Sequence, residues 1–263
     1  MMAEIEVSRD GQIATVLLNR PERMNTISQS MLSTLSSALL DCDQDPEIRA
    51  IVIAGAGRAF CAGLDLQDAA SDEGVSKGGF ALAPKLELRD FPPNVLHHLD
   101  TPTICAINGG AAGFGLDLAL CCDIRIAGQG AKLAAVFTKR GVVPESGGTW
   151  LLPRLIGWAK AAEIVFTGRT LGAEESLELG LVNQVVEDAV LLERARAIAS
   201  EIADNAPLAV QAAKRMMRAG LSEGFDENVE RVYLQVMPLL KSDDFREGFT
   251  AFLEKRKPKF EGR

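Results

Sequence analysis

A chain of 263 residues, 47% of them hydrophobic and 24% charged, is long enough to bury a sizeable core and has an ordinary globular composition. Acidic residues outnumber basic ones by 36 to 28, and the resulting net charge of −8 argues against non-specific nucleic-acid binding. No run of about 18 uncharged apolar residues is present, so we expect no membrane-spanning helix.

The cysteines and the beginning of the chain predict a cellular compartment. Five cysteines are an odd number at irregular spacing, and the start "MMAEIEVSRDGQ" lacks the basic-then-apolar pattern of an export signal. We therefore expect a cytoplasmic protein with reduced thiols.

The first half of the chain alternates strand and helix patterns. Apolar residues alternate about Asp10-Gly11, which predicts a hairpin, and Ser28 is a plausible N-cap for an amphipathic helix over 28–43. Buried strands are expected in "RAIVIAGAG", "TICAINGG" and "DIRIA", with a helix over 113–122 before the last of them.

The second half is mainly helical. One more strand, "LVNQVVE", follows a short helix that ends at Gly180. Further helices are expected over 148–156, 159–166, 173–179, 188–204, 207–219, 225–239 and 243–255. These patterns predict an α/β core over residues 1–190 and an all-helical region over 191–263. The irregular segment 66–94 fits either a lid or binding loop or a surface excursion.

Two glycine-rich turns are candidate binding elements. In "INGGAAGFGLDLALCCD" a strand ends at Ile107 and a helix opens near Gly113, and "AGAGRAFCAGLDL" is a second strand followed by glycines. Neither GxGxxG nor a P-loop is present. The amides of Leu64 and Phe114 are candidates for converging on one oxygen as an oxyanion hole, where each donor contributes roughly 3 kcal/mol. The spacing alone equally fits a close-packed turn without chemistry.

Several motifs together resemble one family. "LNRPERMNTIS", "GRAFCAGLDL", "INGGAAGFGLDLALCCDIRIA", "PESGGTWLLPRLIG", "FTGRTLGAEESLELGLVNQVV" and "FLEKRKPKF" are similar, in this order, to motifs of the crotonase superfamily, the enoyl-CoA hydratase/isomerases. The resemblance implies a crotonase-like spiral of ββα units, a C-terminal helical region that forms homotrimers or hexamers and closes the active site, and an acyl-CoA substrate. It also implies an oxyanion hole of the Leu64 and Phe114 amides and no cofactor besides the CoA of the substrate.

Further residues are candidates for binding CoA. Arg23 is one, together with Lys257 and Lys259 from a neighbouring subunit's tail, because their charges suit the CoA phosphates. Ala62 and Asp65, which flank the second glycine turn, are also expected to bind CoA. No metal site is expected, because Cys121-Cys122 has no nearby histidine.

The acidic residues distinguish between reactions within the family. Hydratases use two glutamates; Asp117 stands at the first of these positions and Phe137 at the second, which puts simple hydration in doubt. Glu145 in "GVVPESGGT" stands where Δ3-Δ2-enoyl-CoA isomerases and the phenylacetate-pathway ring isomerase carry their acid. Dienoyl-CoA isomerases resemble this chain in having an aspartate at the Asp117 position.

A single carboxylate suits double-bond migration. It removes a proton alpha to the thioester and returns it at the gamma carbon, through a dienolate that the oxyanion hole stabilises. We expect Val142, Val143 and Pro144 to desolvate Glu145 and raise its pKa. A purely structural alternative puts Glu145 in the first turn of the next helix, where acids are favoured. Asp117 is expected to be a second acid or, preferably, a supporting residue.

Three other functions stay open at this point. The first is an enoyl-CoA hydratase that adds water to a 2-enoyl-CoA. The second is an acyl-CoA thioester hydrolase with Cys61 or Ser146 as nucleophile, activated by His97 or His98. The third is a catalytically silent acyl-CoA-binding protein, against which the acid at position 145 argues.

Overall fold

The computed structural model describes residues 3–65 and 88–263, and its larger sheet has six strands in the order β1-β2-β3-β5-β7-β10. The predicted hairpin is confirmed, with β1 and β2 antiparallel about a turn in which Gly11 has φ +56°. All other neighbours in this sheet are parallel. The strands are β1 (Ile5–Asp10), β2 (Ile13–Leu18), β3 (Ala50–Gly55), β5 (Thr103–Ile107), β7 (Ile124–Gly128) and β10 (Gln184–Val186).

A second sheet of four short strands, which the sequence analysis did not predict, lies beside the first. Its strands, in the order β4-β6-β8-β9, are β4 (Ala59–Cys61), β6 (Gly110–Ala112), β8 (Lys132–Ala134) and β9 (Thr170–Gly172). Three residues are too few to reveal a period of two. The chain alternates between the sheets, from β3 to β4, from β5 to β6 and from β7 to β8, and this is the expected spiral of ββα units.

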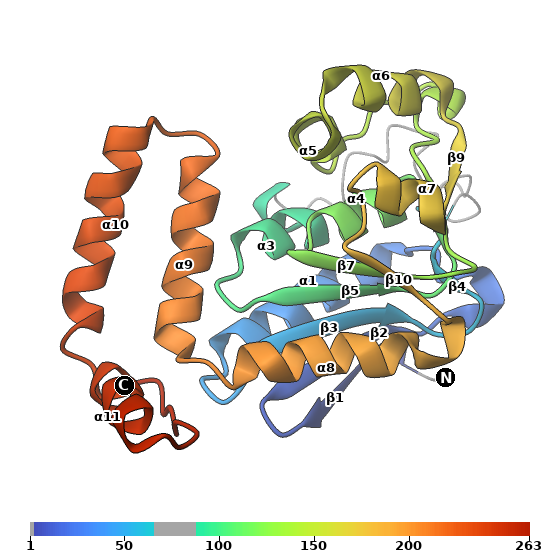
Figure 1. Cartoon of the computed structure of the whole chain (residues 1–263). Coiled ribbons are helices and arrows are strands. Elements are labelled where there is room, and N and C mark those ends of the chain that lie inside the picture. Colours follow the sequence, from blue (N-terminus) through green and yellow to red (C-terminus); the bar gives the residue numbers. More distant parts are fainter. Residues whose placement is uncertain (1–2, 66–87) are drawn as a thin grey trace.

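Helices cover both faces of the large sheet (Figure 1). On one face, α1 (Gln29–Gln44), α3 (Pro92–His98) and α4 (Phe114–Leu120) share a core with alternate residues of β3, such as Ile53. On the other face, α8 (Leu191–Ala203) packs on the intervening residues, such as Val52. The predicted cap of α1 is present, since the Ser28 hydroxyl accepts from the Met31 amide at 3.2 Å.

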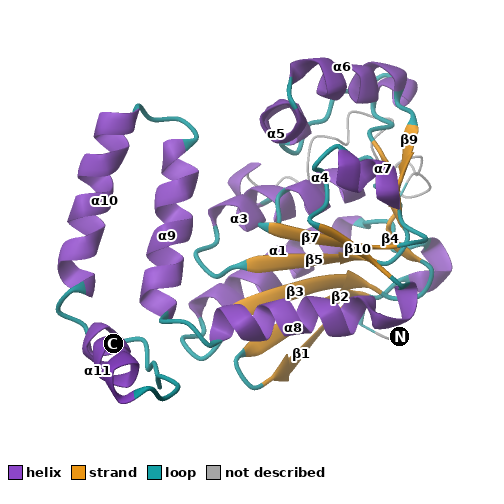
Figure 2. Ribbon diagram, viewed as in Figure 1, coloured by secondary structure: helices purple, strands orange, loops and turns teal. Residues whose placement is uncertain are grey.

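Three helices lie between β8 and β10 along the chain, two of them before β9 and one after it (Figure 2). These are α5 (Gly148–Ile156), α6 (Trp158–Thr167) and α7 (Ala173–Glu178), each close to its predicted range. Short 3-10 turns occupy η1 (Pro21–Arg23), η3 (Leu88–Asp90), η4 (Thr138–Arg140) and η5 (Asp188–Val190). The insertion expected over 66–94 lies mostly outside the described residues, so its role as a lid stays a prediction.

The last three helices form an arm that extends away from the sheets (Figure 1). They are α9 (Pro207–Gly220), α10 (Phe225–Leu239) and α11 (Asp243–Glu254). An ion pair joins the arm to the core, in which Lys214 donates to Asp123 at 2.7 Å. Because α8 packs on the sheet, the arm begins only after Ala203. The predicted division of the chain into a core over 1–190 and a helical region over 191–263 stays a prediction.

Candidate active site

The two candidate oxyanion donors follow paired strands of the small sheet. β4 and β6 are parallel neighbours, with Cys61 opposite Ala111. The C-terminal ends of the two strands therefore lie next to each other at the same end of the sheet. A glycine with positive φ precedes each donor, Gly63 at +108° before Leu64 and Gly113 at +54° before Phe114. A Cβ on Gly63 would lie 4.0 Å from the Phe114 nitrogen, so the two glycine turns are in contact.

The backbone hydrogen bonds leave both amides available. Gly63 and Asp65, on either side of Leu64, both bond to Ile27, so the Leu64 N–H points to the opposite side of the strand. Phe114 is the first residue of α4 and its N–H has no partner within the helix. Within residues 3–65 and 88–263, no acceptor is bonded to either N–H.

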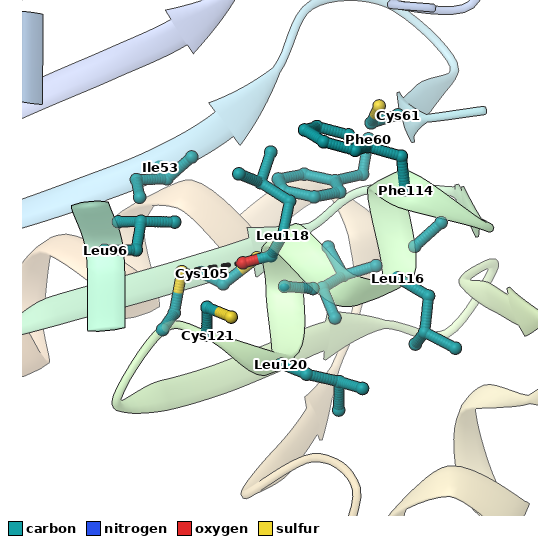
Figure 3. Close-up of a cluster of buried hydrophobic side chains, with 14 of the residues drawn as sticks. Ile53, Phe60, Cys61, Leu96, Cys105, Phe114, Leu116, Leu118, Leu120 and Cys121 are labelled. Carbon is teal, nitrogen blue, oxygen red and sulfur yellow. Dashed lines mark hydrogen bonds between the residues drawn. The ribbon is translucent and has the colours of Figure 1, made fainter. Parts of the chain in front are cut away.

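Close packing holds α4 against β4. The side chains of Phe60 and Phe114 are both buried in one cluster with Leu118 (Figure 3). A Cβ on Gly115 would lie 2.0 Å from the Cys61 carbonyl oxygen, so only glycine permits this approach. The positions of the two candidate amides are therefore fixed by the core.

Asp117 lies in the middle of α4 and is 0% exposed. Its Oδ2 accepts from the Ser146 amide at 3.3 Å, while its Oδ1 has no hydrogen-bond partner among the described residues. Burial, and then the negative charge of Glu145, raise the pKa of Asp117 to about 7. The two carboxyls therefore influence each other electrostatically, although they come from different elements.

Glu145 stands on the turn immediately before α5, and its side chain is exposed in the single chain. The protein around the carboxyl still desolvates it enough to raise its pKa. The expected cause was partly wrong: Val142 and Val143 are 46% and 67% exposed, and of the three neighbours only Pro144 is buried. Of the two candidate acids, Glu145 is the one that a ligand can reach.

Phe137 is buried in the main core and carries no proton to transfer. The resemblance puts the second hydratase glutamate at this position. An apolar side chain here removes one of the two groups that hydration uses.

Asp65 is held by ion pairs that the sequence analysis did not predict. Its carboxylate, 2% exposed, accepts from Arg23 at 2.6 Å and from Arg20 at 3.2 Å. Thr26 donates to the same carboxylate at 3.3 Å, and Ala62 donates its amide to the carbonyl of Met24 at 3.1 Å. These contacts tie the "NRPERMN" loop to the Leu64 turn, and CoA binding by Arg23, Ala62 and Asp65 stays a prediction.

Two buried or polar residues of this loop escaped the sequence analysis. Arg20 lacked any motif that marked it as a partner of Asp65. Asn25 is 0% exposed, and its amide donates to the carbonyls of Ala56 and Ala59 at 2.9 and 2.7 Å. Asn25 has φ +53°, and the only local signal for it in the sequence was that asparagine tolerates this left-handed conformation better than most residues.

Within one chain, the structure does not bring Lys257 and Lys259 to the site. The C-terminus lies beside α11 at the end of the arm, whereas β4 and α4 lie in the core (Figure 1). Lys257 donates to Asp204 at 2.7 Å, and Lys259 is exposed. Contact with CoA from a neighbouring subunit stays a prediction.

The groups of the hydrolase alternative do not form a nucleophile–base pair. Cys61 is fully buried, and burial raises the pKa of its thiol to about 12, so it is not a ready nucleophile. The Ser146 hydroxyl has no partner within the described part of the chain. His97 makes an edge contact with Trp150, and the ring of His98 contacts the Asn94 carbonyl at 2.7 Å.

Two further features of the described residues concern metals and membranes. In this part of the chain, no three or more His, Cys, Asp or Glu side chains gather in a way that suits a metal ion. Nor does any helix there have both the length and the apolar character that a membrane span requires. The absence of a cofactor and the cytoplasmic location stay predictions.

The alternation of the chain between two sheets, in a spiral of ββα units, is the crotonase fold. The family model described as "Enoyl-CoA hydratase/isomerase" matches residues 8–263, and the chain belongs to this family. It is therefore an enzyme of the enoyl-CoA hydratase/isomerase family.

The similar proteins include isomerases as well as hydratases and dehydratases. The chain is 39% identical to the 1,2-epoxyphenylacetyl-CoA isomerase of Escherichia coli K12, with 95% of each chain covered. It is 37% identical to the carnitinyl-CoA dehydratase of Salmonella typhi, with 100% of each covered. The crystal structure of an enoyl-CoA hydratase from Bacillus anthracis superposes with a TM-score of 0.92 at 34% identity, covering 99% of this chain and 100% of that one.

Proposed function

We propose that this enzyme is an enoyl-CoA isomerase that moves a double bond from Δ3 to Δ2, with Glu145 as its acid and base. One observation carries the proposal: of the two candidate carboxyls, Glu145 is exposed and Asp117 is sealed in the core. A single accessible carboxylate suits a reaction in which one group removes a proton and returns it.

The proposed chemistry begins with the thioester carbonyl oxygen bound by the Leu64 and Phe114 amides. Glu145 takes a proton from C2, and the electron pair moves onto the carbonyl oxygen to give a dienolate. Glu145 then returns the proton to C4, and the double bond ends between C2 and C3. The two N–H groups stabilise the charge that develops on oxygen, and such stabilisation usually lowers the barrier more than any other single effect.

The raised pKa of Glu145 favours removal of the proton from C2 and still permits its return to C4. A carboxylate whose conjugate acid is weaker is a stronger base toward C2, and its protonated form is still acidic enough to deliver the proton to C4. Partial desolvation by the surrounding protein causes the shift, and a bound acyl chain would desolvate the carboxyl further.

Hydration is the alternative reaction, and it requires two catalytic groups in the site. It uses one group to activate water and a second to deliver a proton. Phe137 is apolar, and Asp117 has no exposed surface from which to reach a substrate. Because similar proteins include a dehydratase and a hydratase, the experiment below also tests for hydration.

The helical arm supports a proposal about assembly. Its exposed apolar side chains include Phe225, Tyr233, Phe249 and Phe252, all more than half exposed in the single chain. We propose that they pack against other copies in a homotrimer or hexamer, which also gives Lys257 and Lys259 a route to a neighbour's CoA.

A panel of CoA esters tests the reaction. Purified protein is mixed with 3-enoyl-CoA, 2-enoyl-CoA and a ring-epoxide of an aromatic acyl-CoA, and conjugation is followed by ultraviolet absorbance. We expect turnover of 3-enoyl-CoA to the conjugated ester without gain of water. Hydration of 2-enoyl-CoA with no turnover of 3-enoyl-CoA would replace this proposal with the hydratase alternative.

A further inference from the structure

Helix α5 begins without a cap from its own sequence. Its N-cap is Gly147, with φ +103° and no side chain to accept a hydrogen bond. The carboxylate of Asp117 approaches this helix end from α4, since its Oδ2 accepts from the Ser146 amide at 3.3 Å. An acid at this place suits both the free amides and the helix dipole.

Gly148, the first residue of α5, leaves room for this contact because it has no side chain. A Cβ on Gly148 would lie 2.3 Å from Oδ1 of Asp117 and 3.0 Å from its Cγ. The Gly148 amide, like that of Ser146, stabilises the ionised form of Asp117 and so opposes the rise in its pKa. The carboxyl of Asp117 is therefore in direct contact with the backbone at the start of α5.

The contact joins the two halves of the proposed site. Glu145 is the residue directly before Ser146, whose amide Asp117 binds. Phe114, whose amide is the proposed oxyanion donor, lies three residues before Asp117 on the same short helix. One carboxyl thus connects the segment that carries the base to the helix that carries the oxyanion donor.

We propose that Asp117 is a positioning residue: it holds the Glu145 turn at a fixed place relative to the Phe114 amide. This inference rests on the proposed function, since it takes Glu145 as the reacting group. Asp117 itself touches no substrate, because it has no exposed surface.

Electrostatics adds a second effect of the same residue. Glu145 and the thiol of Cys121 are the titratable groups coupled to Asp117 within the described residues. Burial raises the pKa of Cys121 well above its usual range, so that thiol stays neutral. The pKa of Glu145 is raised first by desolvation, and repulsion between the two like charges means that an ionised Asp117 would act in the same direction.

Four variants separate positioning from proton transfer and from a merely structural role. Asp117→Asn keeps an oxygen that accepts from the Ser146 amide but cannot titrate, and Asp117→Leu removes the acceptor. The matched controls are Asp43→Asn and Asp43→Leu. Asp43 on α1 also accepts from two backbone amides of another segment, those of Asp100 and Thr101, at 3.0 and 2.7 Å.

The readouts are kcat, KM and the pH profile of kcat, measured on protein whose folding is checked by circular dichroism. We expect Asp117→Leu to lower kcat on the order of 100-fold with KM nearly unchanged, as for a displaced catalytic group. Asp117→Asn should restore kcat to within tenfold of wild type. It should also remove the rise in kcat near pH 7 that ionisation of Asp117 produces. The Asp43 variants should leave the pH profile of kcat as in wild type.

Gly148→Ala provides a test that leaves Asp117 in place. The added methyl would displace the carboxylate, so we expect at least a tenfold loss of kcat with KM nearly unchanged. This variant also keeps the experiment decisive if Asp117→Leu does not fold.

Two results would overturn the positioning role. One is a loss in Asp117→Asn as complete as in Glu145→Gln, which makes Asp117 a proton-transfer group. The other is less than a tenfold loss of kcat in both Asp117→Leu and Gly148→Ala, or in Gly148→Ala alone if Asp117→Leu does not fold. Failure of wild-type protein to turn over 3-enoyl-CoA is a different outcome, which contradicts the proposed function itself.

Discussion

The carboxylate of Asp65 accepts a hydrogen bond from Arg23 at 2.6 Å, and Asp65 directly follows Leu64, whose amide is the proposed oxyanion donor. The Asp65 amide also donates to the Ile27 carbonyl at 3.0 Å. Asp65 is thus fixed by both its side chain and its backbone. The ion pair therefore sets the position of the neighbouring Leu64 N–H.

Asp65→Asn tests this relationship. The change removes the charge that faces Arg23 and Arg20 and leaves a weaker acceptor. We expect the free energy of unfolding to fall by about 2 kcal/mol and kcat to fall with it. Urea unfolding and steady-state kinetics measure the two effects. As a control, Arg9→Gln breaks the exposed pair with Asp45 and should cost less than about 1 kcal/mol.

Glu145→Gln should abolish isomerisation more thoroughly than any other single change. Loss of a general acid and base lowers kcat by roughly 10² to 10⁴-fold, while KM for the CoA ester changes little. Glu145→Asp should retain part of the rate, because it keeps the carboxylate one methylene further away. Full activity of Glu145→Gln would remove this residue from the mechanism.

The pH dependence of stability reports on Asp117. Its pKa is about 7 in the folded chain and 3.8 as the reference for the unfolded chain, so the folded state holds this proton more tightly. The free energy of unfolding therefore falls as pH rises from about 4 to 7, by up to ~4 kcal/mol from this group. In Asp117→Asn this part of the slope should be missing in urea unfolding at pH 4 and pH 8. An identical slope in both proteins would contradict the raised pKa.

The arm should mediate assembly. Phe252 is 81% exposed in the single chain, so a large apolar side chain is in contact with water there. We expect light scattering to give a mass of about 85 kDa, three times 28.2 kDa, or twice that. Phe252→Glu should shift the protein toward monomer, and Val7→Glu, an exposed apolar site on β1, should not. A monomeric wild type would contradict the assembly proposal.

Cys61→Ala tests the hydrolase alternative. The thiol is buried and its pKa is about 12, so we expect isomerase activity within about threefold of wild type. Release of free CoA, followed with a thiol reagent, should stay at background in both proteins. Thiol release that disappears in the variant would support a cysteine hydrolase instead.

Much of the fold could be predicted from local patterns. The hairpin about Gly11, the helix capped by Ser28 and the helices after residue 147 follow from periodicity, capping and turn residues that act within a few positions. The resemblance supplied the spiral and pointed to Leu64, Phe114 and Glu145. The short strands β4, β6, β8 and β9 escaped, because three residues carry no periodic signal.

The sequence by itself determined which chemical groups the chain brings to a reaction: two glycine-preceded amides, one acid on a turn and a phenylalanine where hydratases have a second acid. Only the tertiary structure decided that Asp117 is sealed and Glu145 is reachable, and that Arg20 and Arg23 share Asp65. The physical reason is that burial and electrostatic coupling depend on distances between segments far apart in the chain, which local spacing does not encode.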